Sequence, residues 1–267
     1  MIIYYHININ KPIIKLSLFK QYFPSNYTQI FTSNLNHSQS TSPPTILPLF
    51  PYTPPMNCPL CSTPSQLYHT HTERDDQQYF RCPKCQSIAM HPRHYLTREE
   101  EKARYLTHNN DVNDPGYQKF VRPVIQAVTT RTQTNHQGLD YGAGTGPVIT
   151  KLLREKGYSM TTYDPIFIPN SEALNATYDF IVCCEVAEHF HDPQSEFARF
   201  NQLLHHGGLL VIKTELLTSE TDFPNWYYIN DPTHTLFYSP KGIRLILEQH
   251  GFKTLELSPR LVVAKKV

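Results

Sequence analysis

A nine-residue stretch, Leu139–Pro147, constrains the fold of this chain more than any other feature. Gly142, Gly144 and Gly146 alternate within it, and residues without a Cβ let the backbone reverse while it lies close to a ligand. Pro147 suits the first turn of a following helix, where its missing backbone N–H costs nothing. The stretch therefore predicts a strand, a glycine-rich turn and a helix in direct succession.

The residues around these glycines favour a positively charged ligand over a dinucleotide. Their spacing, G-x-G-x-G, differs from the G-x-G-x-x-G of dinucleotide-binding folds. Asp140 lies two residues before the first glycine, where its carboxylate would repel a pyrophosphate. The same carboxylate suits a ligand that carries a sulfonium and an ammonium group. We therefore expect a cationic small molecule at this turn.

From residue 138 onward, strand-like and helix-like stretches alternate, which predicts a doubly wound α/β fold with a mostly parallel sheet. We expect strands over 158–163, 179–184 and 209–213, helices after residues 147, 192 and 239, and a closing hairpin over 253–265. The first helix should end at Gly157 and the second at Gly207. Asp164 follows the second strand, 22 residues after Gly142. It could accept two hydrogen bonds from ribose hydroxyls, or it could open the turn at Pro165.

Charge and hydropathy restrict the partners of this chain. Its 267 residues carry 24 Lys and Arg against 23 Asp and Glu, without a basic stripe that would follow a phosphate backbone. The composition therefore gives no reason to expect a nucleic-acid partner, although it does not exclude one. No apolar run is long enough for a membrane span or a convincing secretion signal, so we expect a cytoplasmic protein.

Residues 1–55 differ in composition from the remainder of the chain. They contain no Gly, Asp, Glu, Arg or Cys, and six prolines crowd residues 43–55. These prolines argue against a packed element, so we expect a disordered leader. Alternatively, translation begins at Met56, two residues before the first cysteine.

Two Cys-x-x-Cys pairs give the most specific local signal. Cys58 and Cys61 form one pair and Cys82 and Cys85 the other, with 20 residues between them. This is the spacing of a zinc ribbon, in which four thiolates surround a structural zinc ion. Two disulfides are the alternative, but no secretion signal indicates an oxidising compartment. Zinc binding worth roughly 10–16 kcal/mol would fold a unit that is too small to fold on its own core.

Helical patterns connect the ribbon to the α/β region. Thr97 and Glu100 form a capping box for a helix that runs to about residue 106. After a polar loop, apolar residues recur at helical spacing from Tyr117 to Val128, and we expect Pro123 to kink this helix. The predicted organisation is a leader at 1–55, a zinc ribbon at 56–95, connecting helices at 96–130 and an α/β domain at 131–267.

Several of these motifs together resemble one large enzyme family. Leu139–Pro147, Asp164, Tyr178–His189, the Gly207-Gly208 pair and the closing hairpin are similar to class I S-adenosylmethionine-dependent methyltransferases over residues 115–267. The nearest similarity is to ubiquinone-biosynthesis O-methyltransferases, whose fourth strand ends in a comparable Glu-Val-x-Glu-His. The resemblance implies a seven-stranded Rossmann-like sheet in which only the last strand is antiparallel.

The resemblance also implies how S-adenosylmethionine is held. Asp140 and the glycine loop would hold the methionine part, and Asp164 would hold the ribose. Glu185 is a further expected cofactor-binding residue. The loop residues expected at this site are Gly142, Ala143, Gly144 and Gly146. Residues 165–177 show neither a clear third strand nor the acidic motif that often holds the adenine, so we assign no adenine contacts.

Polar residues that follow the fourth and fifth strands predict the acceptor site, because ligands of open parallel sheets bind beyond the carboxyl ends of the strands. The segment from residue 215 to 238 is too long for a simple connection, and we interpret it as a lid with Trp226 and Tyr228 as its aromatic wall. His189 or His234 would act as general base. Further catalytic candidates are Asp231 and Glu185.

Two alternatives for this region remain open. Glu185, Glu188 and His189 could bind a divalent ion that polarises an acceptor hydroxyl, as the resemblance to ubiquinone O-methyltransferases implies. In the second alternative, His189 caps the next helix and the aromatic residues of the long segment belong to the core.

The sequence thus predicts an S-adenosylmethionine-dependent enzyme that methylates an oxygen or nitrogen of a small or carrier-bound molecule, with the ribbon as scaffold or substrate clamp. RNA is the alternative acceptor, because a ribosomal-RNA guanine methyltransferase family also carries an N-terminal zinc ribbon. A further alternative is a non-catalytic zinc-ribbon interaction module that binds S-adenosylmethionine. The glycine spacing disfavours an NAD-dependent oxidoreductase.

Overall fold

The computed structural model describes residues 56–108 and 111–267, and these residues belong to one compact unit. The predicted leader, residues 1–55, lies outside the described residues, so that prediction stays untested. Within the described part of the chain, no helix combines the length and apolar character needed to span a membrane.

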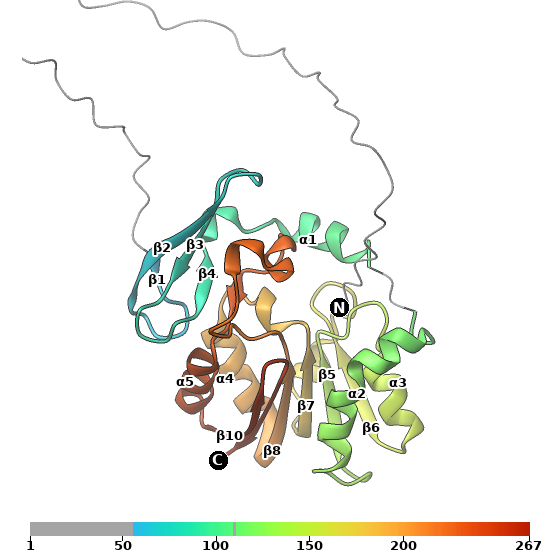
Figure 1. The fold of residues 1–267 in the computed structure, drawn as a ribbon. Helices are drawn as coiled ribbons and strands as arrows, with labels where there is room; N and C mark the ends of the chain where they lie inside the picture. Colours follow the sequence, from blue (N-terminus) through green and yellow to red (C-terminus); the bar gives the residue numbers. More distant parts are fainter. Residues whose placement is uncertain (1–55, 109–110) are drawn as a thin grey trace, which may run out of the picture. The chain divides into compact units, whose positions relative to one another are not determined.

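A six-stranded sheet forms the centre of the α/β region, in the order β10-β11-β8-β7-β5-β6 (Figure 1). Its strands are β5 (Gln137–Tyr141), β6 (Ser159–Tyr163), β7 (Tyr178–Cys184), β8 (Leu204–Lys213), β10 (Phe252–Ser258) and β11 (Leu261–Lys266). Strands β5 to β8 pair in parallel, whereas β11 pairs antiparallel with both β8 and β10. The expectation that only the last strand is antiparallel is therefore confirmed.

The sheet has six described strands, so the expected count of seven is wrong. Residues 165–177, where the missing strand would lie, form a single antiparallel bridge between Asp164 and Ile168 and a 3-10 helix at Ser171–Leu174. Pro165 and Pro169 remove two backbone donors from this short segment, which prevents it from joining a central sheet.

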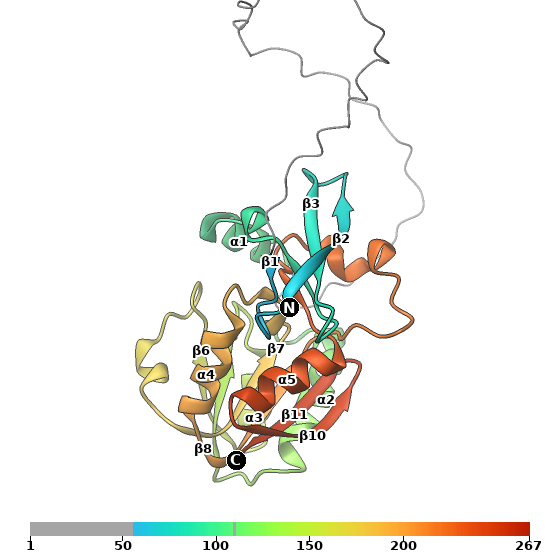
Figure 2. The same ribbon diagram turned by 90° about the vertical axis from the view of Figure 1, so that its left-hand side faces the viewer.

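Helices cover both faces of this sheet, as predicted for a doubly wound fold (Figures 1 and 2). α2 (Pro115–Thr129) and α3 (Val148–Glu155) pack on one face, and α4 (Pro193–Leu203) and α5 (Pro240–Gln249) on the other. Alternate residues of each buried strand enter different clusters, as pleating requires. In β7, Ile181 joins the cluster of α4 and α5, while Phe180 and Val182 join that of α2 and α3.

The helix starts follow from capping chemistry. Asp114, Asp192 and Ser239 each accept a hydrogen bond from a backbone N–H in the first turn, and a proline follows each of them. The predicted end of the second helix at Gly207 is wrong: α4 ends at Leu203 and the chain enters β8 directly. Leucine residues at this boundary suit a buried strand as well as a helix, so periodicity alone did not separate them.

A second, five-stranded sheet has the order β1-β2-β3-β4-β9, and the two cysteine pairs lie in the connections between β1 and β2 and between β3 and β4. Its first four strands are β1 (Met56–Asn57), β2 (Pro64–His71), β3 (Gln77–Arg81) and β4 (Ile88–Met90). The fifth, β9 (Leu236–Phe237), comes from the long segment after β8 and pairs antiparallel with β4. The sequence did not predict this pairing, by which the ribbon and the α/β region share one sheet.

Short helices complete the described structure. α1 (Arg98–Tyr105) begins with the predicted capping box of Thr97 and Glu100. The remaining 3-10 helices are η1 (Pro92–His94), η3 (Ala187–His189), η4 (Phe223–Asn225) and η5 (Tyr227–Asn230). Both η4 and η5 lie in the long segment after β8, which therefore contains more secondary structure than a simple loop.

Candidate functional site

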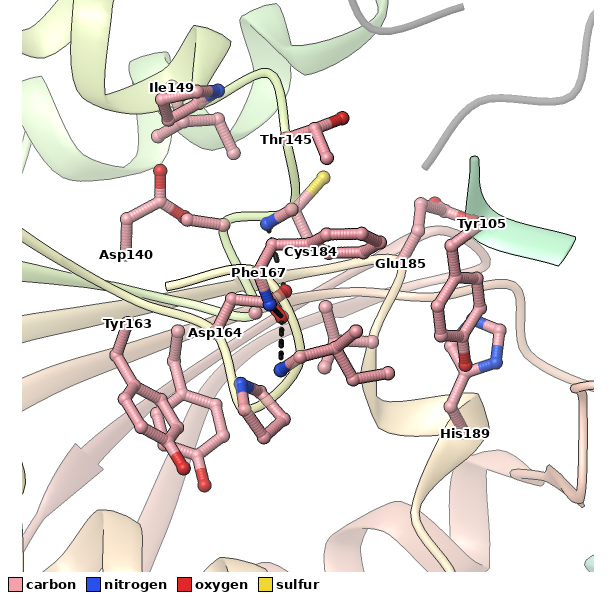
Figure 3. Close-up of a pocket in the computed structure, with 18 of the residues that line it drawn as sticks. Tyr105, Asp140, Thr145, Ile149, Tyr163, Asp164, Phe167, Cys184, Glu185 and His189 are labelled. Carbon is pink, nitrogen blue, oxygen red and sulfur yellow. Dashed lines mark hydrogen bonds between the residues drawn. The ribbon is translucent and has the colours of Figure 1, made fainter. Parts of the chain in front are cut away.

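A cavity of about 400 Å³ lies at the carboxyl ends of β5, β6 and β7 (Figure 3). This is the position at which open α/β sheets bind ligands, and the volume is in the range of small-molecule sites. Most of the predicted site residues line it: Asp140, Gly142, Ala143, Gly144, Gly146, Asp164, Glu185 and His189. The cavity therefore joins the predicted cofactor residues to part of the predicted acceptor site.

Two glycines shape the floor of the cavity. Gly142 has φ +79°, and a Cβ at this position would lie 2.4 Å from Val186 Cγ2, so a side chain is excluded. Gly144 has φ +60°, and a Cβ there would meet no atom within 4 Å. The backbone at Gly144 thus leaves open the space that a side chain would fill. This arrangement fits a ligand that lies directly on the loop.

Asp140 places a buried carboxylate beside the loop. Its side chain is 4% exposed and accepts a hydrogen bond of 2.7 Å from Thr150 Oγ1 of α3. Burial raises the pKa of Asp140 to about 6, because a charge is costly in a poorly solvated environment. A cationic ligand would offset this cost, which fits the ligand expected from the sequence.

Asp164 connects the tip of β6 to the glycine loop. Its Oδ2 accepts from the Gly144 backbone N–H at 3.0 Å, and its Oδ1 accepts from the N–H groups of Ile166 and Phe167 at 2.8 and 2.9 Å. A carboxylate offers about four acceptor positions, so about one remains for a ligand. The turn-opening role that the sequence left open is therefore present. The expected pair of hydrogen bonds from ribose hydroxyls would compete with these backbone hydrogen bonds for the Asp164 carboxylate.

α1 covers the cavity, and the sequence analysis missed its contribution. Glu101 and Tyr105 of this helix line the cavity. Arg98 donates to the carbonyl oxygen of Pro165, and Glu101 Oε1 lies 3.1 Å from His191 Nε2. The spacing of these three α1 residues, i, i+3 and i+7, places them on one helix face, and this pattern could have identified them.

His189 lies at the end of the cavity beside Tyr105, with its ring centroid 5.4 Å from that of the tyrosine (Figure 3). Its Nδ1 is 2.9 Å from the carbonyl oxygen of Thr233, which requires the proton to be on Nδ1. Nε2 has no hydrogen-bond partner among the described residues. Burial lowers the pKa of His189, so the ring is neutral at pH 7 and its buried Nε2 carries a lone pair.

Glu185 follows β7 in a strained backbone conformation with φ +52°. Its Oε1 forms an ion pair of 3.0 Å with Lys213, the last residue of β8. The Lys213 ammonium also lies 3.6 Å from the centroid of the Phe120 ring. The sequence analysis missed Lys213, since a single lysine at a strand end carries no distinctive signal. Burial raises the pKa of Glu185, and the neighbouring Glu188 carboxylate raises it further.

Glu188 is completely buried behind the cavity. Its Oε1 accepts from the Tyr228 hydroxyl at 2.6 Å, and its Oε2 has no partner within the described ranges. Tyr228 also donates to Glu185 Oε2 at 3.3 Å and therefore bridges the two carboxylates.

His234 and Asp231 lie in a layer behind His189, and neither lines the cavity that the described residues form. The His234 ring is 4.8 Å from that of His189, and its Nδ1 is 2.6 Å from the Tyr228 carbonyl oxygen. Asp231 accepts hydrogen bonds from Thr233 and an ion pair of 2.9 Å from Arg104 of α1. Asp231 therefore fastens the cover helix rather than contacting a ligand.

Trp226 and Tyr228 do not form the expected aromatic wall. Both pack in a hydrophobic cluster with Phe223 of η4 and Phe237 of β9, away from the described lining of the cavity. The alternative, in which these aromatic residues belong to the core, describes their position correctly. The reason is the pairing of β9 with β4, which turns the apolar side of this segment toward the ribbon.

One group of side chains could hold a divalent ion, and it differs from the expected set. Ligand atoms of Glu188, His189 and His234 lie within 4.8 Å of one another. Glu185 is instead held by Lys213, so the predicted trio of Glu185, Glu188 and His189 does not assemble. Both histidines have Nδ1 at a backbone carbonyl, which leaves Nε2 for a ligand, as is usual for metal-bound histidine.

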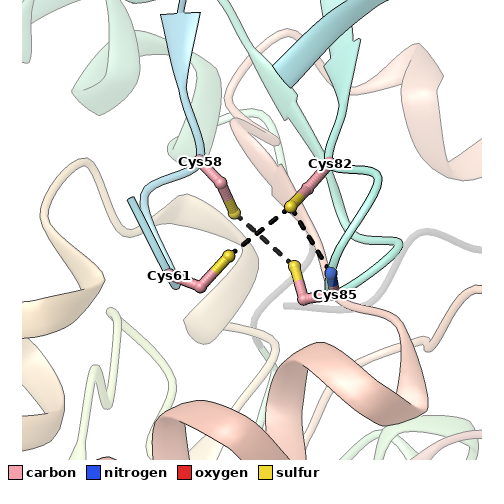
Figure 4. A group of neighbouring side chains, drawn as sticks. All are labelled: Cys58, Cys61, Cys82 and Cys85. Carbon is pink, nitrogen blue, oxygen red and sulfur yellow. Dashed lines mark hydrogen bonds between the residues drawn. The ribbon is translucent and has the colours of Figure 1, made fainter. Parts of the chain in front are cut away.

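The four cysteines of the ribbon converge on one point (Figure 4). The sulfurs of Cys58 and Cys85 are 3.5 Å apart, as are those of Cys61 and Cys82. No disulfide links these free cysteines, and a tetrahedral zinc site with Zn–S bonds of 2.3 Å requires sulfurs about 3.8 Å apart. The arrangement therefore fits four-thiolate coordination.

Comparisons with known proteins found several similar solved structures. Magnesium protoporphyrin IX methyltransferase from Synechocystis PCC 6803 is similar at 15% identity and a TM-score of 0.45, over 64% of this chain and 95% of that one. 1,6-Didemethyltoxoflavin-N1-methyltransferase from Burkholderia thailandensis is similar at 15% identity and a TM-score of 0.49, over 75% of this chain and 100% of that one. No curated protein matched the chain.

Because both TM-scores are below 0.5, these two likenesses carry no weight here. A family model provides the stronger finding: the one described as "Methyltransferase domain" matches residues 116–257, just over half of the chain. The match covers the glycine loop, the strand tips and His189, and the strand order agrees with the class I arrangement. The chain therefore belongs to the methyltransferase-domain family, as a class I S-adenosylmethionine-dependent methyltransferase.

Proposed function

We propose that this enzyme transfers a methyl group from S-adenosylmethionine to an oxygen or nitrogen of a small or carrier-bound molecule that enters the cavity beside His189. One observation carries the proposal: the glycine loop, Asp164 and His189 line a single cavity, and the buried Nε2 of His189 has no hydrogen-bond partner among the described residues. Donor and acceptor could therefore lie side by side.

The charge of the cavity supports a small acceptor that is not a phosphate. Its described lining contains six carboxylates against one guanidinium, that of Arg199. The carboxylates belong to Glu101, Asp140, Asp164, Glu185, Asp192 and Glu196. Such a lining attracts cations and repels phosphate groups, which disfavours the RNA alternative.

The residues of the chain would act mainly by positioning and by excluding water. S-adenosylmethionine, when bound, supplies an electrophilic methyl group that is transferred by in-line displacement, so alignment dominates the rate. Gly144 leaves the space in which the ligand lies, Asp140 offsets its positive charge, and Asp164 offers one acceptor position. Glu101 and Tyr105 of α1 cover the cavity from solvent.

His189 would remove the proton from an acceptor hydroxyl or amine. The proton moves to Nε2, while the Thr233 carbonyl keeps the Nδ1 proton in place and orients the ring. His234 lies behind His189 and does not reach the cavity lining, so we assign the base role to His189 alone.

Alternatively, the Nε2 lone pair of His189 could bind a divalent ion together with Glu188 and His234. Two imidazoles and one carboxylate are suitable ligands for such an ion, and the Glu188 Oε2 and His189 Nε2 atoms have no partners among the described residues. The ion would lower the pKa of an acceptor hydroxyl. Metal analysis of the wild type and of His234→Ala separates the two uses, because only the ion requires His234.

We further propose that the four cysteines bind one structural zinc ion. The sulfur separations and the burial of three of the four side chains support this.

Calorimetric titration with S-adenosylmethionine, S-adenosylhomocysteine and NAD tests the proposal at its first step. We expect both adenosyl sulfur compounds to bind and NAD to bind at least tenfold more weakly, because Asp140 would repel a pyrophosphate. Equal or tighter binding of NAD would contradict the proposed function.

A further inference from the structure

We infer that the ribbon is a positioning element of the methyltransferase site, which sets the orientation of His189 through β9. The consequence for methyl transfer rests on the proposed function of His189, whereas the positioning itself does not. Each link between the cysteine pairs and the imidazole is a contact between described residues.

The first link is the pairing of β4 with β9. Ile88 pairs with Phe237 and Ala89 with Leu236, so the last ribbon strand, β4, lies antiparallel beside a strand of the methyltransferase region. Beyond this ladder, the Met90 backbone N–H donates to the carbonyl oxygen of Thr235 at 2.8 Å. The segment from 235 to 237 therefore takes its position from the ribbon.

The second link runs from this segment to the turn that carries His189. The Thr235 N–H donates to the Glu188 carbonyl oxygen at 2.9 Å, and the His189 Nδ1–H donates to the Thr233 carbonyl oxygen at 2.9 Å. The Tyr238 hydroxyl donates to the Ala187 carbonyl oxygen at 3.0 Å. Two successive backbone hydrogen bonds thus connect the ribbon to the residue next to His189.

The cysteine pairs themselves are fastened to the same region. Ser239, the N-cap of α5, donates from its hydroxyl to the Cys85 carbonyl oxygen and from its backbone N–H to Ser87 Oγ at 3.0 Å. Gln194 of α4 donates to the carbonyl oxygens of Pro59 and Leu60 at 3.1 and 3.0 Å. Each cysteine pair therefore contacts the first turn of a different helix of the methyltransferase region.

Aromatic packing between β3 of the ribbon and the segment after β8 is a further link. Tyr79 of β3 is fully buried, with its ring 5.4 Å from that of Phe223 and 5.9 Å from that of Phe237. The ribbon thus supplies part of the core that fixes β9. A ribbon without its metal would lose the geometry of β4 and release this segment.

The cofactor loop depends on other contacts. The N–H groups of Gly142 and Ala143 donate to the Tyr163 carbonyl oxygen, and that of Gly144 donates to Asp164. All of these partners belong to the α/β sheet. Disturbing the ribbon should therefore change His189 and leave S-adenosylmethionine binding intact, a separation that general unfolding would not produce.

The test uses the full chain with ¹⁵N-labelled histidine, before and after removal of bound metal by a chelator. With the metal present, the His189 signals should report one tautomer, protonated at Nδ1. After removal they should report a mixture of tautomers, and amide hydrogen exchange over 233–237 should accelerate at least tenfold. Affinity for S-adenosylmethionine should change less than threefold. Unchanged tautomer signals and exchange rates after removal would overturn the inference, as would equal loss of cofactor binding.

A variant test covers the case in which the metal-free protein unfolds. Ser87→Ala keeps all four thiolates but removes the Ser87 Oγ contact with Ser239. It should raise exchange over 233–237, whereas Lys84→Ala, an exposed position between the same two cysteines, should not. Equal exchange in both variants contradicts the inference. If the tautomer responds but His189→Ala keeps full activity, the positioning stands and the proposed base role fails.

Discussion

At the scale of single residues, burial decides the chemistry of the site. Asp140 and His189 are ordinary titratable residues in the sequence, and both lose much of their contact with water in the fold. Burial disfavours the charged form in each case, which raises the pKa of the acid and lowers that of the imidazole. A cationic ligand would therefore stabilise the charged form of Asp140, and the His189 imidazole is neutral at pH 7.

Asp140→Asn should weaken S-adenosylmethionine binding and stabilise the ligand-free protein. Loss of a charged contact predicts about 10–100-fold weaker binding at pH 7.5. Because the folded pKa of about 6 exceeds the ordinary 3.8, the stability from protonated Asp140 is complete below pH 3.8 and lost as pH rises through 6. At pH 7.5 the asparagine removes a cost of at most about 3 kcal/mol.

Calorimetry and urea unfolding measure these two effects. Wild-type affinity should also fall as the pH drops below about 6, where Asp140 becomes protonated, and the variant should lack this dependence. A variant that binds S-adenosylmethionine as tightly as the wild type at pH 7.5 would refute the role of Asp140.

Gly144→Asp should abolish detectable binding of S-adenosylmethionine. A side chain at this position would project into the open space beside the loop, and φ +60° is costly for a residue with a Cβ. Gly157→Asn is the matched control, since Gly157 also has positive φ but lies at the end of α3. Normal calorimetric binding by the Gly144 variant would show that the ligand does not lie on this loop.

His189→Ala should retain S-adenosylmethionine binding and lose methyl transfer by roughly 10²–10⁴-fold, the usual contribution of a general base. Because burial lowers its pKa below 6.5, the wild-type rate should decline only as the pH falls below that value. His234→Ala should retain more activity, since His234 does not line the described cavity. Full activity in the His189 variant would show that alignment of the methyl donor and the acceptor is sufficient and that no base at this position is needed.

At the scale of elements, α1 is mostly polar, contains no fully buried residue and yet lines the cavity. Its position depends on specific polar contacts rather than on an apolar face. Arg98 contacts the turn after β6, Glu101 pairs with His191, and Arg104 pairs with buried Asp231. A helix held in this way can separate from the cavity without exposing a hydrophobic surface, which suits a cover that admits an acceptor.

Arg104→Met should destabilise the protein by about 1–3 kcal/mol, because it leaves the fully buried Asp231 carboxylate without its cationic partner. Lys102→Met, on the exposed side of the same helix, should change stability by less than about 0.5 kcal/mol. Urea unfolding of both variants at pH 7.5 measures the difference. Equal stabilities would show that the ion pair does not hold α1.

At the scale of the whole molecule, the ribbon and the methyltransferase region share a sheet and a hydrophobic cluster. The four cysteines therefore influence more than their own unit. If they bind zinc, the binding energy contributes to the folding of β4 and, through it, to the segment that contains His234.

The purified protein should contain one zinc ion per chain, and Cys82→Ser should lose it. We expect this variant to unfold at a lower temperature in its ribbon while S-adenosylmethionine still binds, because the glycine loop depends on the other sheet. Elemental analysis and calorimetry provide the measurements. Cys184→Ser is a control for zinc content only, since Cys184 lies at the end of β7 and outside the cysteine cluster but lines the cavity. Absence of zinc from protein prepared without chelators would contradict the assignment.

Local chemistry in the sequence determined much of this protein. The glycine loop, the helix caps at Asp192 and Ser239, and the cysteine spacing each act over a few residues, so their patterns predict structure directly. The family resemblance rested on the same local motifs, and the match over residues 116–257 confirms it. The cavity-lining residues Asp140 and His189 were identified for the same reason.

Only the tertiary structure decided the contacts between distant segments. The pairing of β4 with β9 joins residues about 150 positions apart, and no local pattern encodes it. That pairing packs Tyr228 and the partly buried Trp226 into a hydrophobic cluster, and the neighbouring contacts place His234 behind His189 and α1 over the cavity. A long, aromatic segment suits a lid or a core equally well in sequence. Its role follows from which surface it packs against, and that depends on the free energy of the whole fold.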